Sequence, residues 1–339
     1  MKSEIEILQK LGIEKLNPMQ LDAKEAIQNN HEVLLLSPTG TGKTLAFLLP
    51  LFNQIDHKEQ STQLLIVVPT RELAIQIEQV CKDMGSGLKV NAVYGGRSTK
   101  KDLEELNHQP HVLIGTPGRL ADHLDRKTVD VKTIKFLVLD EFDKSLEIGF
   151  NEDMKFISKE LKYLKKKVLT SATFGVQVPN FVHFKKPTEL NFLSTKKSQL
   201  EELIVFSQHK DKLQALVKLI KSKGNANGIV FCNFKNAIQR IGDFLDKHNL
   251  AHSIFQGGLE QKDRERALIK FRNGSTKILL ATDLAARGLD IPDLDYIIHY
   301  HLPTTKEEYT HRNGRTARMN TCGTAFILWY KEEPLPKYI

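Results

Sequence analysis

The sequence predicts an α/β protein with two tandem domains, each a doubly wound parallel sheet covered by helices. Two observations carry this prediction. Short, continuous apolar runs alternate with amphipathic stretches, and the pattern restarts after a polar segment near the middle of the chain. Such runs are typical of parallel strands that helices bury on both faces. The length of 339 residues agrees, because one domain takes about 150 residues.

The apolar runs give the expected strands. In the first domain they cover residues 33–36, 64–68, 112–114 and 136–139, and in the second 229–232, 278–281, 296–298 and 325–328. Residues 73–84 and 237–250 carry helix-period apolar positions, and crossovers through such helices are expected to be right-handed. We interpret the run Lys165 to Lys167 as a solvated turn in preference to a nucleic-acid contact.

The polar segment LSTKKSQLEEL marks the domain boundary, which we place near residues 195–199. We therefore expect a first domain over residues 1–195, a linker over 196–201 and a second domain over 202–339.

Composition is that of an ordinary globular protein, with 40% hydrophobic and 27% charged residues, which excludes disordered and collagen-like classes. The net charge of +8 and the pI of about 9.1 favour a polyanionic partner. Charge alone does not separate RNA, DNA and acidic membranes. We expect no signal peptide and no membrane span. Cys81, Cys232 and Cys322 are scattered, which fits a reducing compartment, and we expect a cytoplasmic location.

A glycine-rich loop, SPTGTGKT, lies between an apolar run and the apolar stretch LAFLLPLF. Strand, loop and helix in this order are the context that a phosphate-binding P-loop needs. Gly40 and Gly42 allow the tight turn that points backbone N–H groups at phosphates. Lys43 is expected to neutralise phosphate charge, and Thr44 to bind Mg²⁺. The candidate nucleotide-binding residues of the loop are Ser37, Pro38, Thr39, Gly40, Thr41, Gly42, Lys43 and Thr44.

Two acidic residues, Asp140 and Glu141, directly follow the apolar run FLVL. Parallel sheets present ligand-binding residues at the carboxyl ends of their strands. Asp140 is therefore predicted to hold Mg²⁺, through water, and Glu141 to orient or deprotonate an attacking water molecule.

Further motifs follow in a set order. The first domain carries GIEKLNPMQ (12–20), PTRELA (69–74), GG (95–96), TPGR (116–119), DEFD (140–143) and SAT (171–173), and the second carries IVFCN (229–233), QKDR (261–264), ATDLAARGLD (281–290) and HRNGRTAR (311–318). With this series, the chain resembles a DEAD-box RNA helicase over nearly its whole length. The resemblance implies two RecA-like domains with the ATP site in the cleft between them.

The resemblance also implies roles for individual residues. Gln20 would read adenine, and Asp290 would contact the ribose of ATP. Arg315 and Arg318 would be arginine fingers on the γ-phosphate, a task that suits a planar, permanently charged fork. His311 and Arg287 would position water or relay closure. The implied catalytic set is Glu141, Arg287, His311, Arg315 and Arg318.

RNA contacts in this family go mainly to sugar and phosphate, which implies binding without sequence preference. The RNA-binding residues carried over are Pro69, Thr70, Arg71, Gly96, Thr116, Gly118, Arg119, Arg264 and Thr282. We expect the protein to act as a monomer.

Four positions depart from the family pattern. Phe142 replaces the alanine of DEAD, so its ring must pack in the core or displace the SAT segment. Ile13 stands where an aromatic residue usually stacks on adenine. Phe234 replaces a polar residue, and Ala317 replaces a glycine.

The resulting prediction is an ATP-dependent RNA helicase that couples ATP hydrolysis to local duplex unwinding or RNP remodelling. Two alternatives use the same motifs: an ATP-gated RNA clamp or assembly platform with little unwinding, and a DNA-directed helicase of the same superfamily.

Overall fold

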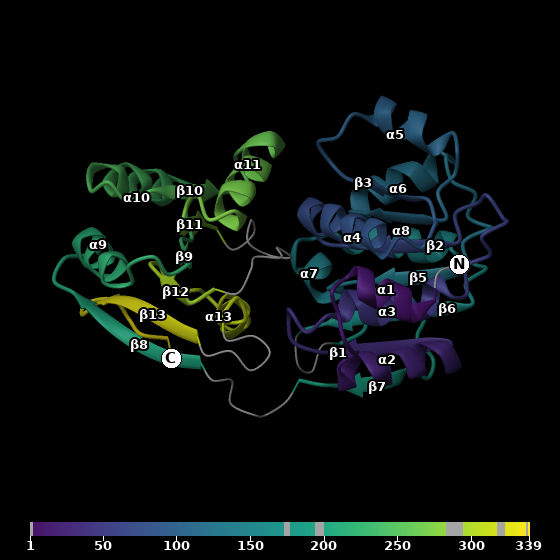
Figure 1. The fold of residues 1–339 in the computed structure, drawn as a ribbon, viewed down its shortest axis with the longest axis horizontal. Helices are drawn as coiled ribbons and strands as arrows, with labels where there is room; N and C mark the ends of the chain where they lie inside the picture. The colour runs from purple at the N-terminus through teal and green to yellow at the C-terminus, as the bar shows by residue number, and fades with distance from the viewer. Residues whose placement is uncertain (1–2, 173–176, 194–199, 283–293, 317–322, 337) are drawn as a thin grey trace. The chain divides into compact units, whose positions relative to one another are not determined.

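The chain forms two compact units, Met1–Ser194 and Thr195–Ile339, each built on one parallel sheet (Figure 1). The computed structural model describes residues 3–172, 177–193, 200–282, 294–316, 323–336 and 338–339. The predicted fold class, two tandem doubly wound α/β units, is confirmed.

The first unit has a seven-stranded sheet of order β3-β4-β2-β5-β6-β1-β7. Its strands are β1 (Glu32–Leu36), β2 (Leu64–Val67), β3 (Val90–Val93), β4 (Val112–Gly115), β5 (Phe136–Leu139), β6 (Lys166–Ser171) and β7 (Thr188–Asn191). The helices are α1 (Glu4–Lys10), α2 (Pro18–Asn29), α3 (Lys43–Phe52), α4 (Arg71–Met84), α5 (Thr99–Leu106), α6 (Pro117–Asp125), α7 (Phe142–Glu147) and α8 (Asn151–Glu160), with a short 3₁₀ helix, η1 (Asn180–Val182).

Apolar side chains fill both faces of this sheet, as the continuous apolar runs require. On one face α3 and α4 pack through residues such as Phe47 and Ile77, and on the other α6, α7 and α8 pack through residues such as Leu120 and Ile157. All the pairings are parallel, for example Val33 beside Val168 where β1 meets β6. The carboxyl ends of the strands therefore meet at one edge of the sheet.

The second unit has a six-stranded sheet of order β10-β11-β9-β12-β13-β8. Its strands are β8 (Leu200–Ser207), β9 (Gly228–Phe231), β10 (His252–Phe255), β11 (Ile278–Ala281), β12 (Tyr296–His299) and β13 (Gly323–Tyr330). The helices are α9 (Leu213–Ser222), α10 (Lys235–Lys247), α11 (Gln261–Arg272) and α13 (Lys306–Asn313). α9 and α10 cover one face, and α11 packs on the other through residues such as Phe271.

Every predicted apolar run is a strand, with ends that differ by at most two residues. The interpretation of Lys165 to Lys167 as a solvated turn is wrong for two of the three residues. Lys166 and Lys167 begin β6 and are half-buried. The ammonium of Lys166 donates to the carbonyls of Gln28 and Asn30 at 2.9 and 3.0 Å, so these lysines close the amino-terminal end of the sheet.

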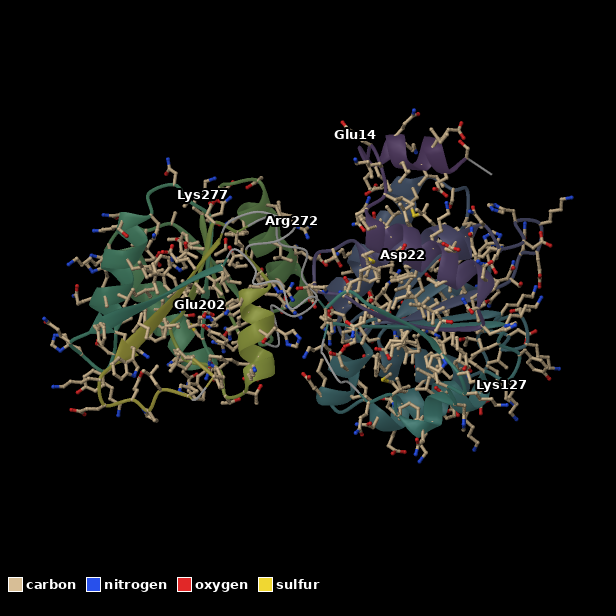
Figure 2. All side chains as sticks on the ribbon, turned by 90° about the horizontal axis from the view of Figure 1, so that it is seen from below. Glu14, Asp22, Lys127, Glu202, Arg272 and Lys277 are labelled. Carbon is tan, nitrogen blue, oxygen red and sulfur yellow. The ribbon has the colours of Figure 1, made fainter. Side chains whose placement is uncertain are left out.

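Many charged side chains are exposed on the outside of each unit. Figure 2 shows Glu14, Asp22 and Lys127 on the first unit and Arg272 and Lys277 on the second. The polar surface thus surrounds cores whose strands are almost wholly apolar.

Candidate nucleotide and RNA site

Strand order divides the carboxyl edge of the first sheet into two neighbouring halves. The P-loop follows β1, the DEFD motif follows β5, and β6, which ends in Ser171, lies between them. The predicted RNA motifs follow β2, β4 and β3, which adjoin β5 in that order. The motifs predicted to bind nucleotide and those predicted to bind RNA therefore lie in two neighbouring parts of this edge, which we call the nucleotide half and the RNA half.

The P-loop turns through two left-handed glycines, Gly40 at φ 79° and Gly42 at φ 84°. Helix α3 begins directly after Gly42, and no side chain caps its first N–H groups. The Lys43 ammonium donates to the carbonyls of Ser37 and Pro38, both at 2.7 Å. Uncapped N–H groups and a lysine drawn over the loop are the arrangement that a phosphate group fits. The loop is therefore suited to a nucleoside triphosphate.

Helix α2 is fastened to the P-loop through two amides. Asn17 caps α2 and exchanges hydrogen bonds with Gln20, and its side chain also donates to the carbonyl of Thr41 at 3.0 Å. Gln20 is buried and donates from Nε2 to the carbonyl of Gly42 at 3.2 Å. The predicted adenine-reading residue thus touches the loop itself. Ile13 is partly buried against the core cluster that also contains Ile27 of α2.

Thr170 connects the two acidic residues. Its hydroxyl donates to Oδ1 of Asp140 and accepts the backbone N–H of Glu141 at 3.1 Å. Asp140 is buried. Burial raises the pKa of its carboxyl group, although the Thr170 hydrogen bond and the charge of Lys43 act in the opposite direction. Oxygen ligands of this kind fit Mg²⁺.

Glu141 lies in the left-handed region, at φ 49° and ψ 47°. That backbone costs a non-glycine residue about 1 kcal/mol, and such strain tends to occur at functional positions. Phe142 starts α7, is fully buried and belongs to the core cluster on that face. Its ring therefore packs in the core, the first of the two outcomes expected for this departure from DEAD.

The backbone joins the SAT segment to the P-loop. The N–H of Ser37 donates to the carbonyl of Ser171 at 3.0 Å. Together with the Thr170 hydroxyl, this bond makes the end of β6 a physical link between phosphate loop and acidic pair.

In the RNA half, Arg71 lies against the glycine pair. A Cβ atom added to Gly96 would be 2.4 Å from Nη1 of Arg71, and Gly96 has φ +87°. Thr70 caps α4 by accepting the N–H of Leu73 at 3.2 Å. The segments after β2 and β3 are thus in contact, and the glycine is needed for both space and backbone conformation.

Arg119 is held by a carboxylate that has no exposed surface. Its Nε and Nη2 lie 2.8 and 2.7 Å from Oδ2 of Asp102, and Nη2 also donates to the carbonyl of Arg97. Arg97 approaches the other oxygen of Asp102 at 3.2 Å. His123 Nε2 lies 3.4 Å from Asp102, and burial lowers the pKa of this ring. Two guanidinium groups thus share one buried carboxylate.

The second unit anchors its arginine helix internally. Arg312 on α13 is almost fully buried, donates to the carbonyl of His301 at 2.6 Å and to Asn233 Oδ1 at 2.8 Å, and lies over the ring of Phe231. Its role is to join α13 to the end of β9. Arg264 lies over the ring of Phe255, 5.0 Å from its centroid.

The remaining predicted residues fall at strand ends or outside the described residues. Pro69 precedes α4, Thr116 and Gly118 start α6, and Thr282 follows β11. His311 is on α13 and Arg315 lies just beyond it, buried. The residues Arg287, Asp290, Ala317 and Arg318 lie outside the part of the chain that the structure describes.

Four supporting residues were given no role by the sequence prediction, although the first two lie within motifs named above: Asn17, Asn233, Asp102 and Thr170. Asn17 before proline is a helix-start pattern, and Thr170 directly precedes SAT, so both carried a signal. Asp102 did not, because a carboxylate on an amphipathic helix is usually solvated.

A P-loop after one strand and an acid after another, on a parallel sheet of this order, define a P-loop nucleoside-triphosphate-binding protein. The family DEAD/DEAH box helicase matches residues 17–181, and the helicase conserved C-terminal domain matches residues 211–320. The chain belongs to the DEAD-box helicase family.

Curated relatives and solved structures agree with this assignment. The chain is 35% identical over 318 residues to "ATP-dependent RNA helicase DeaD" of Klebsiella pneumoniae, covering 92% of this chain and 50% of that protein. It is 32% identical over 332 residues to "DEAD-box ATP-dependent RNA helicase CshA" of Bacillus cereus, covering 96% and 63%.

Two solved structures are similar over most of the chain. Mss116p bound to ssRNA and AMP-PNP has a TM-score of 0.87 at 27% identity, covering 98% of this chain and 73% of that one. S. cerevisiae Dbp5 bound to RNA and ADP BeF3 has a TM-score of 0.83 at 27% identity, covering 96% and 87%.

The chain spans about half the length of the DeaD relatives that it matches. Among the described residues, none of the helices combines the length and apolar character needed to cross a membrane.

Proposed function

We propose that this chain is an ATP-dependent RNA helicase that uses ATP and Mg²⁺ to open short RNA duplexes locally. One observation carries the proposal. The end of β6 links the P-loop to the acidic pair through the Ser37–Ser171 backbone bond and the Thr170 hydroxyl. The predicted RNA motifs continue along the same edge of the sheet.

The nucleotide half supplies the groups that hydrolysis needs. Lys43 and the α3 N–H groups would hold the phosphates, and Thr44 with Asp140 would hold Mg²⁺, which would supply positive charge to offset that of the phosphates. Glu141 would orient the attacking water and take its proton. The left-handed backbone of Glu141 and the hydrogen bond from its N–H to the Thr170 hydroxyl fix the backbone position from which that side chain extends.

RNA would bind the sugar-phosphate contacts of both units without sequence preference. ATP and RNA together would favour closure, which brings Arg315 and Arg318 to the γ-phosphate. Because the two ligands favour the same state, each raises the affinity for the other. We propose that the protein acts as a monomer in the cytoplasm.

The test measures RNA-stimulated ATPase activity, displacement of a short RNA duplex and RNA residence time on the same preparation. We expect ATP-dependent displacement, and for Glu141→Gln we expect ATP binding with RNA retained and displacement lost. Long residence of RNA without displacement by the unaltered chain would assign an RNA clamp instead. Equal stimulation by DNA of the same length would assign a DNA-directed enzyme.

A further inference from the structure

A large excess of positive charge is concentrated in one segment of the first unit. Residues 1–194 contain 26 lysines and arginines and 25 acidic residues, so the unit as a whole is almost neutral. The segment from Lys155 to Lys186 nevertheless contains eight lysines and a single acidic residue, Glu160. The imbalance is therefore local, and the motifs of the proposed function do not use it.

The fold gathers this segment at the amino-terminal edge of the sheet, opposite the nucleotide and RNA motifs. Lys165 directly precedes β6, and its N–H donates to the carbonyl of Lys135, just before β5, at 2.7 Å. The ammonium of Lys167 donates to the carbonyls of Val182 and His183, both at 3.0 Å. Residues 182–186 are therefore fastened beside the start of β6.

Glu32, the acidic residue at the start of β1, is occupied by other groups. Its Oε2 accepts the backbone N–H groups of Lys185 and Lys186 at 2.8 and 3.1 Å. Burial raises the pKa of this carboxyl, but these N–H groups and Lys167 outweigh it and lower the pKa below the usual value. The carboxylate thus stays ionised while it binds backbone N–H groups of the two exposed lysines.

Six of the eight lysines are exposed; two of these, Lys155 and Lys159, are on α8, and the other four lie shortly before β6 and β7. We call these four the lysine surface: Lys162, Lys165, Lys185 and Lys186. Across the described part of the chain, no carboxylate lies within ion-pair distance of any of them. Lys135, by contrast, pairs with Glu59 at 2.8 Å. Tyr163 lies next to Lys162 in the sequence and is 55% exposed, so the surface includes an aromatic ring on which a base can stack.

We propose that the lysine surface binds the phosphate backbone of an RNA segment beyond the strand held at the carboxyl edge. Unpaired ammonium groups release counterions from a polyanion, and lysines beside an exposed aromatic ring suit single-stranded RNA. The inference rests on the proposed function, because a long RNA already held by the carboxyl edge makes this second contact intramolecular.

The test variant carries Lys162→Gln, Lys165→Gln, Lys185→Gln and Lys186→Gln. Its control removes the same charge from four exposed lysines of the second unit that have no ion pair among the described residues, with Lys210→Gln, Lys218→Gln, Lys221→Gln and Lys247→Gln. Binding is measured with an RNA of roughly 10 nucleotides, about one site size, and with one of roughly 40.

The lysine-surface variant is expected to bind the long RNA with about tenfold lower affinity. The slope of log affinity against log salt concentration should become shallower by up to about 3, since each lysine that contacts a single strand contributes about 0.7 to that slope. Affinity for the short RNA, and ATPase stimulation by it, should match the unaltered chain. The control variant should keep its affinity for both RNAs.

Equal losses on the short and long RNA, or an unchanged salt slope on the long one, would overturn the inference. Loss of binding to phosphatidylserine vesicles with RNA binding intact would assign the surface to a membrane and overturn it too. Failure of the helicase proposal itself is distinguishable, because the unaltered chain would then show no RNA-stimulated ATPase activity.

Discussion

Replacing Thr170 by valine tests how the Thr170 hydroxyl holds the acidic pair, Asp140 and Glu141. Valine keeps the shape of the side chain but removes the hydroxyl that donates to Asp140 and accepts the N–H of Glu141. A hydrogen bond to a charged group contributes about 1.5–3 kcal/mol and a neutral one about 1 kcal/mol. The local opening free energy of β5 and β6 should therefore fall by about 2–4 kcal/mol.

The same substitution should reduce kcat more than it reduces ATP binding. Without the hydroxyl, the carboxylates of Asp140 and Glu141 lose their fixed starting positions, and a displacement near 1 Å costs on the order of 10²-fold in rate. Hydrogen exchange of β5 and β6 amides measures the opening, and RNA-stimulated ATPase activity measures the rate.

Thr133→Val is the matched control. The Thr133 hydroxyl lies within 2.8 Å of the carbonyls of Thr62 and Asp130, away from the nucleotide motifs. This control should lose about 1 kcal/mol of stability and keep its kcat. A Thr170→Val protein whose β5 and β6 amides exchange as before, and whose kcat stays within about twofold, would refute the reasoning.

Three further predictions address other parts of the structure. Gly42→Ala should raise KM for ATP about tenfold, since φ 84° costs alanine about 1 kcal/mol and the new Cβ would meet Gln20 Nε2 at 2.4 Å; unchanged KM would contradict this. Burial lowers the pKa of His299 to about 3 in the folded chain, so the unfolded chain takes up the proton first as the pH falls. Below about pH 6.5 the free energy of unfolding of the second unit should therefore decrease by about 1.4 kcal/mol per pH unit. Fluorescence of Trp329, the single tryptophan, reports that unfolding, and a flat profile from pH 6.5 to 5 would exclude it. Arg119→Lys should speed hydrogen exchange in α5 and weaken RNA binding, because one ammonium replaces the forked contact to buried Asp102; α5 exchange equal to that of the unaltered chain would argue against this role.

The sequence was sufficient to predict the central strands of both sheets except β6, whose first two residues are lysines. Runs such as Leu64–Val67 and Phe136–Leu139 are apolar throughout because helices cover both faces. The strands that were not predicted have mixed composition: β3 reads VNAV, β6 KKVLTS, β7 TELN, β8 LEELIVFS and β10 HSIF. All of these except β6 lie at sheet edges, where one side of the strand is free and the apolar signal weakens.

The site was predictable where chemistry dictates residue type and spacing, as in the P-loop. The site was less predictable where a functional residue is held by a residue that is distant in the sequence. Thr170 meets Asp140 only because β6 lies beside β5, and Asp102 meets Arg119 only because α5 packs near α6. Neither contact has a spacing rule along the chain. The nucleotide and RNA roles of Arg287, Asp290 and Arg318 stay predictions.

The path of the chain through the first sheet also suggests which segment of the first unit could be exchanged between family members. The chain leaves the nucleotide half at Gln63 and returns at Lys135, whose N–H donates to the carbonyl of Gln63 at 2.8 Å. Everything between, which includes β2, β3 and β4 with the predicted RNA motifs of this unit, is one excursion whose two ends touch. An exchange of this excursion would need only two joints, which lie side by side, but the exchanged residues would have to pack against the shared core. We expect chimaeras that swap residues 64–134 between family members to carry the donor's RNA preferences while the recipient's ATP loop is left untouched.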